Sequence, residues 1–208
     1  MARRGVLLAL EGVDGCGKST QAGLLATALL ERGLEVVLTC EPTNGPLGQQ
    51  IREYFQGPTR HLSAKEELNL FMADRREHVE EVIDPALAEG KIVITDRYYY
   101  SSVAYQGALG LDPDRILAQN EIMAVPPDLA VIFTLPVPQA LARLSGTPQR
   151  ARQVSEDLTY LERVATIYAG LQGPHLRHLD ASAPAQAVHA ALLSLTLEFL
   201  ETAGPRGE

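Results

Sequence analysis

The segment that most constrains this chain is Gly12-Val-Asp-Gly-Cys-Gly-Lys-Ser19, which fits the pattern G-x-x-x-x-G-K-[ST] at every position. An apolar run, Val6–Leu10, precedes it, and an amphipathic segment over Lys18–Arg32 follows it. A strand, a glycine-rich loop and a helix in this order can wrap backbone N–H groups around phosphate oxygens, and the helix N-terminus adds partial positive charge. The motif therefore predicts a site for a nucleoside triphosphate.

Within this loop, Lys18 is expected to reach the β- and γ-phosphates, and the hydroxyl of Ser19 is expected to bind Mg²⁺. Cys16 has no paired base nearby in the sequence, so it is interpreted as a small space-filling residue. A glycine-rich turn that merely joins a strand to a helix is the alternative, and the complete match in the right context disfavours it. The residues assigned to the nucleotide site are Gly12, Val13, Asp14, Gly15, Cys16, Gly17, Lys18, Ser19 and Thr20.

Short, nearly continuous apolar runs alternate with longer amphipathic segments, which is typical of buried parallel strands joined by helices. The predicted strands are Val6–Leu10, Val36–Thr39, Ile92–Thr95, Leu129–Leu135 and His175–Leu179. The predicted helices are Lys18–Arg32, Ala64–Glu89, Asp114–Met123, Pro138–Leu144, Glu156–Leu171 and Pro184–Thr202. The pattern predicts a three-layer α/β P-loop fold, with a five-stranded parallel sheet flanked by helices on both faces. We expect one domain over residues 1–208, with a polar lid segment at 143–155.

The net charge of −8 argues against a protein that binds nucleic acid polymers, because such binding requires a basic surface that neutralises phosphates. No apolar stretch approaches the ~20 residues of a membrane helix, and the N-terminus lacks a signal-peptide pattern. Two cysteines are too few for a disulfide framework, so the expected location is the cytoplasm.

Asp96 directly follows the predicted strand Ile92–Thr95. Ligands of open α/β sheets bind at the carboxyl ends of the strands, so an aspartate there is well placed to hold Mg²⁺ or its waters. A carboxylate that only caps a turn is the alternative. Arg97, the next residue, favours the phosphate and metal interpretation.

The run Asp96-Arg-Tyr-Tyr-Tyr-Ser-Ser-Val-Ala-Tyr-Gln-Gly107, together with the stretch from Glu11 to Thr20, resembles the thymidylate kinase family. Members of that family phosphorylate dTMP to dTDP with ATP and Mg²⁺. Further matches, in the right order over nearly the whole chain, are Glu41-Pro42, Gly48–Arg52, Phe71–Arg75, Pro127–Leu129 and Leu179–Ala181. The resemblance implies small-molecule substrates dTMP and ATP, and a homodimer.

The resemblance also implies roles for individual residues. Phe71 would stack on thymine, Arg75 one turn later would bind the base, and Gln106 offers the donor and acceptor that a pyrimidine edge requires. Arg97 would bind the acceptor phosphate, and Asp14 would contact the sugar 3′-hydroxyl. Without the resemblance, Phe71 would be interpreted as an ordinary core aromatic. The residues assigned to the acceptor are Glu41, Arg52, Phe71, Arg75, Arg97, Ser102, Tyr105 and Gln106.

The lid departs from the family pattern. Members with glycine at the position of Gly15 usually carry a catalytic arginine in the lid, so the catalytic residues implied are Lys18, Asp14, Arg97 and a lid arginine, Arg152 or Arg150. Arg152 aligns best, and Arg143 is a further candidate. Ala151 and Val154 stand at the acidic positions that often flank this arginine, and Gln153 stands where a bulky residue often lies near the sugar. Cys40 stands where an arginine commonly precedes Glu-Pro.

Three other functions remain open at this point. A kinase for another nucleoside or nucleoside monophosphate would share the phosphate loop and differ at the base site. A non-catalytic P-loop nucleotide-binding protein would bind ATP without turnover, and a simple ATPase would hydrolyse ATP without an acceptor. No N-K-x-D motif is present, which disfavours a guanine-specific switch.

Overall fold

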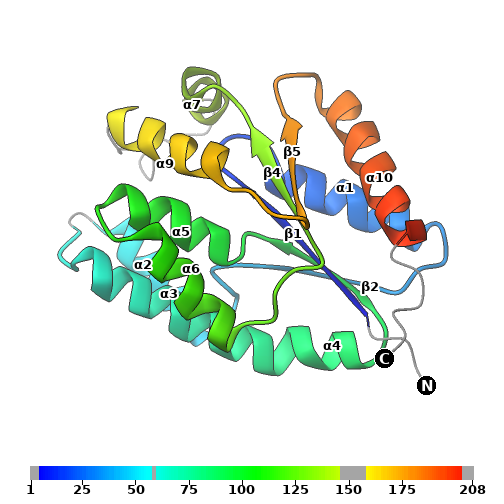
Figure 1. Cartoon of the computed structure of the whole chain (residues 1–208), viewed down its shortest axis with the longest axis horizontal. Helices are drawn as coiled ribbons and strands as arrows, with labels where there is room; N and C mark the ends of the chain where they lie inside the picture. Colours follow the sequence, from blue (N-terminus) through cyan, green and yellow to red (C-terminus); the bar gives the residue numbers. More distant parts are fainter. Residues whose placement is uncertain (1–4, 58–59, 146–157, 203–208) are drawn as a thin grey trace.

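The computed structural model describes residues 5–57, 60–145 and 158–202. Five parallel strands form one sheet in the order β2-β3-β1-β4-β5 (Figure 1). The five predicted strands and the parallel α/β fold are confirmed. The strands are β1 (Val6–Gly12), β2 (Val36–Cys40), β3 (Ile92–Asp96), β4 (Leu129–Thr134) and β5 (Leu176–Asp180).

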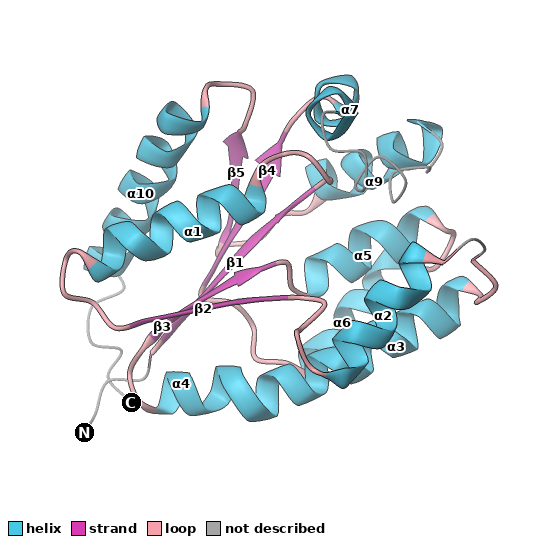
Figure 2. Cartoon of the chain, turned by 180° about the vertical axis from the view of Figure 1, so that it is seen from behind, coloured by secondary structure: helices cyan, strands magenta, loops and turns pink. Residues whose placement is uncertain are grey.

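Helices cover both faces of this sheet (Figure 2). One face carries α1 (Lys18–Leu30) and α10 (Ala185–Thr202), which pack on each other. The opposite face carries α4 (Asp84–Ala88), α5 (Tyr99–Ala108) and α9 (Leu158–Gly170). Outside these lie α2 (Pro46–Gln56) on α3 (Ala64–His78), α6 (Pro113–Met123) on α5, and α7 (Val137–Ser145) on α9. Among the described helices, none is both long and apolar enough to cross a membrane.

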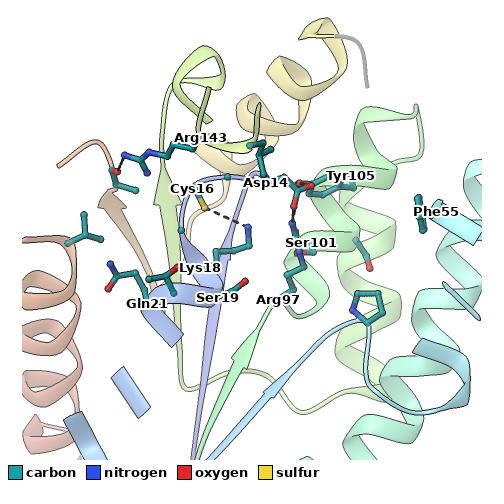
Figure 3. A pocket seen from close by; sticks show the side chains of 18 of the residues that line it. Asp14, Cys16, Lys18, Ser19, Gln21, Phe55, Arg97, Ser101, Tyr105 and Arg143 are labelled. Atoms are coloured by element: carbon teal, nitrogen blue, oxygen red, sulfur yellow. Dashed lines mark hydrogen bonds and ion pairs between the residues drawn. The ribbon is translucent and has the colours of Figure 1, made fainter. Parts of the chain in front are cut away.

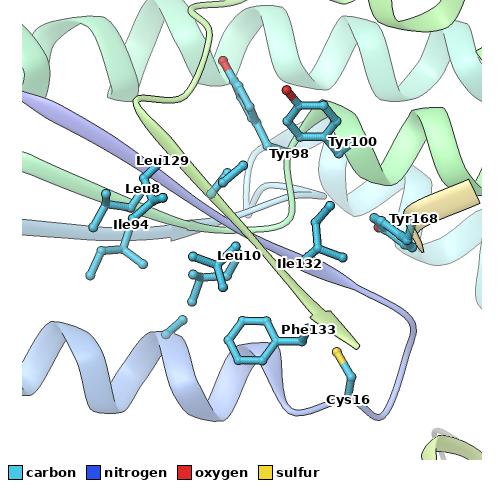
Figure 4. Close-up of a cluster of buried hydrophobic side chains, with 14 of the residues drawn as sticks. Leu8, Leu10, Cys16, Ile94, Tyr98, Tyr100, Leu129, Ile132, Phe133 and Tyr168 are labelled. Atoms are coloured by element: carbon cyan, nitrogen blue, oxygen red, sulfur yellow. The ribbon is translucent and has the colours of Figure 1, made fainter. Parts of the chain in front are cut away.

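The main core is built on both faces of the sheet because successive strand side chains point in opposite directions. Figure 4 shows Phe133 of β4 on the face covered by α1, and Tyr98 and Tyr100 on the opposite face. Cys16 is buried in this core beside Phe133, which agrees with its interpretation as a space-filling residue.

The predicted long helix over 64–89 is present as α3, a π-helical turn η1 (Val79–Ile83) and α4. Its start has a capping box, in which the Ser63 hydroxyl accepts from the Glu66 N–H and the Glu66 carboxylate accepts from the Ser63 N–H. The π turn ends two residues before Pro85, which has no N–H to donate and whose ring crowds the preceding turn.

Two helices, α2 and α5, were not predicted. Asn44-Gly45-Pro46 is typical of a turn, yet Pro46 occupies the first turn of α2, where a missing N–H costs nothing. The Tyr- and Ser-rich start of α5 favours a strand by propensity. Its helical conformation depends on contacts from outside the segment, which are described with the site below.

The sheet order places a crevice at the carboxyl end of β1. The connection that follows β1 enters α1 on one face of the sheet, whereas those that follow β3 and β4 lead to α5 and α9 on the opposite face, and ligands bind where such connections separate. Leu10 of β1 pairs with Asp96 of β3, and Gly12 pairs with Phe133 of β4. The glycine-rich loop and the Asp96-Arg97 pair therefore meet at one edge.

Two adjacent leucines of α1 test this arrangement. Leu29 is 0% exposed in the core, whereas Leu30 is 54% exposed. We expect Leu29→Ala to lower the free energy of unfolding by about 2–5 kcal/mol, because it leaves a cavity, and Leu30→Ala to change it by less than about 0.5 kcal/mol. Urea unfolding followed by circular dichroism measures both, and equal losses would contradict the packing of α1.

Candidate active site

A cavity of about 910 Å³ opens at the carboxyl edge of the sheet. Figure 3 shows Arg143 and Gln21 at one end, Phe55 at the other, and Lys18, Ser19 and Arg97 between them. Residues 14–21 of the loop and α1 form its floor. The cavity is therefore a single space with two ends that meet over the glycine-rich loop.

The loop has the geometry that phosphate binding requires. Gly17 adopts φ +102 at the N-cap of α1, and a side chain there would meet no atom within 4 Å, so this backbone faces open space. The first N–H groups of a helix lack intrahelical partners and can bind an anion. The Lys18 ammonium is buried and donates to the carbonyl of Val13 at 2.9 Å. This contact holds it against the loop.

Ser19 and Asp96 meet at the foot of the cavity. The Ser19 hydroxyl donates to Oδ2 of Asp96, whereas the buried Oδ1 of Asp96 has no hydrogen-bond partner among the described residues. A hydroxyl and a carboxylate whose buried Oδ1 is unpaired fit Mg²⁺, which takes few protein ligands and completes its shell with water and phosphates. No described group of three or more His, Cys, Asp or Glu residues could hold a metal without such partners.

Asp14 and Arg97 form an ion pair at the centre of the cavity, with 2.5 Å between Asp14 Oδ1 and Arg97 Nη2. The Tyr105 hydroxyl donates to Asp14 Oδ2 at 2.9 Å. Burial opposes ionisation of Asp14, but the charges of Arg97 and Lys18 outweigh it and lower the pKa of this carboxyl to about 2. The Asp14 side chain is still 43% exposed, so it can also meet a ligand.

Arg97 has a left-handed backbone conformation, φ +73, which is unfavourable for a residue with a side chain. Three hydrogen bonds hold this turn. The Arg97 N–H donates to the carbonyl of Leu10, the Thr95 hydroxyl donates to the carbonyl of Arg97, and the Tyr98 N–H donates to the carboxylate of Glu11. Strain of this kind persists where the surroundings fix it, and here it directs the guanidinium into the cavity.

Glu11 is fully buried behind this turn and supplies the external support for α5. Its Oε1 accepts from the N–H groups of Tyr98 and Ser101, and its Oε2 accepts from the hydroxyls of Ser101 and Tyr168. Two of these donors belong to the first turn of α5, whose N-cap residue makes no side-chain cap of its own. Burial raises the pKa of Glu11 to about 6, although Ser101 and Arg97 favour its charged form.

The end of the cavity opposite Arg143 is lined by aromatic and polar side chains. The ring of Phe71 lies 5.7 Å from that of Phe55, centroid to centroid, and Arg60 lies over Phe55 at 4.3 Å. Arg52 donates to the carbonyl of Pro42 at 2.9 Å. Of the residues assigned to the acceptor, Arg52, Phe71, Arg97, Ser102, Tyr105 and Gln106 line this cavity.

Arg75 and Glu41, also assigned to the acceptor, are buried behind the wall and are not among the lining residues. Arg75 donates to Glu41 Oε2 at 2.6 Å, to Asn120 at 2.6 Å and to the Ser102 hydroxyl at 3.2 Å. His78 also contacts Glu41, at 3.0 Å. Among the described hydrogen-bond partners of Arg75, Ser102 is the one that lines the cavity, so Arg75 acts on the cavity through Ser102.

The other end of the cavity is lined by Arg143, Gln21 and the segment 181–185. Arg143 donates to the carbonyl of Ala181 at 2.9 Å, and Gln21 donates to the carbonyl of Ala185 at 2.9 Å. These contacts connect α7 and α1 to the loop that precedes α10. Arg150, Arg152, Gln153 and Val154 lie outside the described residues.

Several residues that line the cavity are not identified by the sequence patterns. Phe55 was missed because α2 was not predicted, although Ile51, Arg52 and Phe55 share one helical face. Arg60 follows α2 in the chain and reaches the cavity by stacking on Phe55. Ser101 and Tyr160 also line the cavity, and the sequence assigns neither of them, nor Glu11, to the site. No local pattern indicates that Glu11 caps a helix 87 positions further along the chain.

Comparisons with known proteins agree with the site. A family model described as thymidylate kinase matches residues 10–192. A thymidylate kinase of Desulfotalea psychrophila is 42% identical over 199 residues, which cover 96% of this chain and 98% of the relative. One from Xanthomonas campestris pv. campestris (strain B100) is 50% identical over 200 residues, covering 94% and 86%. One from Xanthomonas oryzae pv. oryzae (strain PXO99A) is 45% identical over 204 residues, covering 96% and 88%.

The buried Glu11 predicts a specific pH dependence of stability. Its pKa is raised from 4.5 to about 6, so the native state holds more protons than the unfolded chain between these values, and stability falls as pH rises through them. The non-titrating variant Glu11→Gln lacks this dependence. We expect the stability of the wild type, relative to this variant, to fall by about 2 kcal/mol between pH 4 and pH 7. Urea unfolding of both proteins across that range measures the difference, and a pH-independent difference would contradict the raised pKa.

Proposed function

The chain belongs to the thymidylate kinase family, and we propose that its single two-ended cavity transfers the γ-phosphate of ATP to the phosphate of dTMP, giving dTDP and ADP. The observation that carries this proposal is the convergence of Lys18 and Arg97 on the middle of the cavity. A nucleotide at each end would bring two phosphate groups together between these cations. Phosphoryl transfer depends mainly on such positioning and on neutralising charge.

The donor occupies the end formed by the glycine-rich loop, Arg143 and Gln21. The backbone N–H groups at the start of α1 and the Lys18 ammonium bind the β- and γ-phosphates. Ser19 and Asp96 hold Mg²⁺, which neutralises the developing charge on the transferred group when it is bound. The purine base then lies towards the segment 181–185, because the phosphate chain must begin at Lys18.

The acceptor occupies the end lined by Phe71 and Phe55. Phe71 stacks on the thymine ring, and Gln106 and Ser102 offer hydrogen bonds to its edge. Arg97 binds the acceptor phosphate, helped by Arg52. Arg75 acts on this site indirectly, because it donates to the Ser102 hydroxyl from behind, and Glu41 holds Arg75 in that position.

Asp14 and Tyr105 lie between the two ends. The Asp14 carboxylate stays ionised at neutral pH because Arg97 and Lys18 lower its pKa. It keeps the Arg97 guanidinium in one orientation and accepts a hydrogen bond from the sugar 3′-hydroxyl of the acceptor. The acceptor phosphate is itself anionic near neutral pH, so the reaction needs no strong base.

The arginine that neutralises the transferred phosphoryl group comes from outside the glycine-rich loop. A Cβ atom at Gly15, where φ is +83, would lie 2.3 Å from the carbonyl oxygen of Ala140, so a side chain cannot occupy this position. Arg143 binds the carbonyl of Ala181 at the donor end. Arg152, with Arg150 as the alternative, therefore supplies the charge from segment 143–155.

Assembly and location follow from the family resemblance rather than from the site. We propose a homodimer in the cytoplasm. The described long helix exposes no large apolar side chain, whereas Ile122 and Leu109, at the ends of α6 and α5, are 87% and 41% exposed. Both cysteines are free thiols in the structure, as in a reducing compartment. Sedimentation velocity distinguishes a dimer from a monomer.

A coupled ADP-release assay with dTMP, dUMP, dCMP, dGMP and UMP tests the reaction. We expect turnover with dTMP, little ATP hydrolysis without an acceptor, and at least a roughly hundredfold loss of kcat in Lys18→Ala. Preference for another monophosphate would indicate a different kinase. Steady hydrolysis without an acceptor would indicate an ATPase, and ATP binding without any turnover would indicate a nucleotide-binding protein.

Separate substitutions Arg152→Ala and Arg150→Ala test the source of the catalytic charge. We expect one of them to lower kcat by at least about a hundredfold, as arginines that stabilise phosphoryl transfer do, with KM for dTMP changed much less. Arg115→Ala on α6 is a matched control, since its side chain is 85% exposed and lies outside the cavity lining. Two lid variants with normal kcat would exclude both arginines.

A further inference from the structure

We propose that Glu11 is a positioning residue, which holds the Arg97 guanidinium in place for the acceptor phosphate without touching either nucleotide. The inference rests on the proposed function, because it concerns how the acceptor is bound. Glu11 lies at the end of β1, is fully buried, and is not among the residues that line the cavity. Its four hydrogen bonds all lead to elements that border the acceptor site.

The first link runs through the backbone. Glu11 Oε1 accepts from the N–H of Tyr98, the residue that directly follows Arg97, at 2.8 Å. It also accepts from the N–H of Ser101 at 3.2 Å. Since the left-handed conformation at Arg97 is unfavourable by itself, fixing the next peptide is one way in which the fold maintains it.

The second link runs through the Ser101 hydroxyl, whose oxygen lies 2.6 Å from Glu11 Oε2 and 3.0 Å from Arg97 Nη1. A guanidinium can only donate, so Ser101 accepts from Arg97 and gives its single proton to Glu11. The carboxylate therefore fixes the direction of the Ser101 hydroxyl, and that hydroxyl fixes Arg97. Asp14 holds the other terminal nitrogen, Nη2, from within the cavity.

The third link ties α9 to the same carboxylate. The Tyr168 hydroxyl donates to Glu11 Oε2 at 3.0 Å and lies 3.0 Å from the Ser101 hydroxyl. Burial and the negative charge of Glu11 raise the pKa of Tyr168, so it remains a donor. Three segments, β1, α5 and α9, thus meet at one buried group behind Arg97.

These contacts predict that Glu11 affects binding of the acceptor phosphate and not binding of the acceptor base. If Glu11 acts through Arg97, its loss weakens binding of the phosphate and leaves binding of the thymine and sugar unchanged. If Glu11 only stabilises α5, which also carries Ser102, Tyr105 and Gln106, its loss weakens binding of the base as well. Thymidine, which has no phosphate, distinguishes the two as a competitive inhibitor.

The test compares Glu11→Gln and Ser101→Ala with the wild type at pH 8. We expect KM for dTMP to rise about tenfold in each variant, because a hydrogen bond that orients a charged group is lost. KM for ATP and Ki for thymidine should stay within about twofold. Arg97→Ala sets the upper limit for KM. Tyr168→Phe should raise KM for dTMP about threefold. The double variant, Glu11→Gln with Ser101→Ala, should have a KM for dTMP close to that of either single variant, since both changes act through Arg97.

Leu192→Ala is the control for simple destabilisation. Leu192 on α10 is fully buried in the core and lies outside the cavity lining, so its truncation leaves a void away from the site. It should lower the melting temperature without changing any kinetic constant. If Glu11→Gln does not fold, Ser101→Ala carries the test, since it breaks the link to Arg97 and keeps the carboxylate.

Two results would overturn the inference. One is an unchanged KM for dTMP in the folded variants, and the other is a Ki for thymidine that rises as much as KM. Both leave the proposed function intact, because the wild type still phosphorylates dTMP. A wild type that does not use dTMP would instead refute the proposed function itself.

Discussion

The parallel pairing of β1 with β3 is the constraint on which the site depends. Its register places Leu10 beside Asp96, and the hydrogen bond from the Arg97 N–H to the Leu10 carbonyl extends the ladder beyond the end of β3. Asp14 and Arg97, 83 positions apart, are thereby brought into contact. A shift of this register by one residue would turn the side chains of the strand to the opposite face and separate the phosphate loop from the acceptor arginine.

Two carboxylates beside Arg97 differ because their surroundings differ. Asp14 faces the cavity and is paired directly with the guanidinium, which lowers its pKa to about 2. Glu11 is sealed behind the turn and reaches the guanidinium only through Ser101, and its burial raises its pKa to about 6. The outer carboxylate can therefore contact a ligand, whereas the inner one only supports the wall. A buried charge of this kind is tolerable because four donors satisfy it.

The fold was largely predictable because its strands are short apolar runs separated by amphipathic helices. The two missed helices show where this reasoning stops. The Tyr-Tyr-Tyr-Ser-Ser segment favours a strand by propensity, but Glu11 accepts from the N–H groups of the N-cap residue Tyr98 and of Ser101 and so supports a helix there. Because α2 was also missed, Phe55 was not placed opposite Phe71. Arg75 was expected to bind the base, but its contacts to Glu41 and Asn120, distant in sequence, hold it behind the wall.

The sequence by itself determined the phosphate loop, the parallel sheet and the edge at which ligands bind. These features depend on adjacent residues and on short periods, namely the glycines before Lys18, the alternation of apolar runs, and the position of Asp96 at a strand end. Only the tertiary structure decided which side chains face the acceptor, which support it from behind, and that Glu11 holds the turn at Arg97. Those relations depend on strand register and on side-chain packing between residues far apart in the chain. Local sequence patterns specify neither of these.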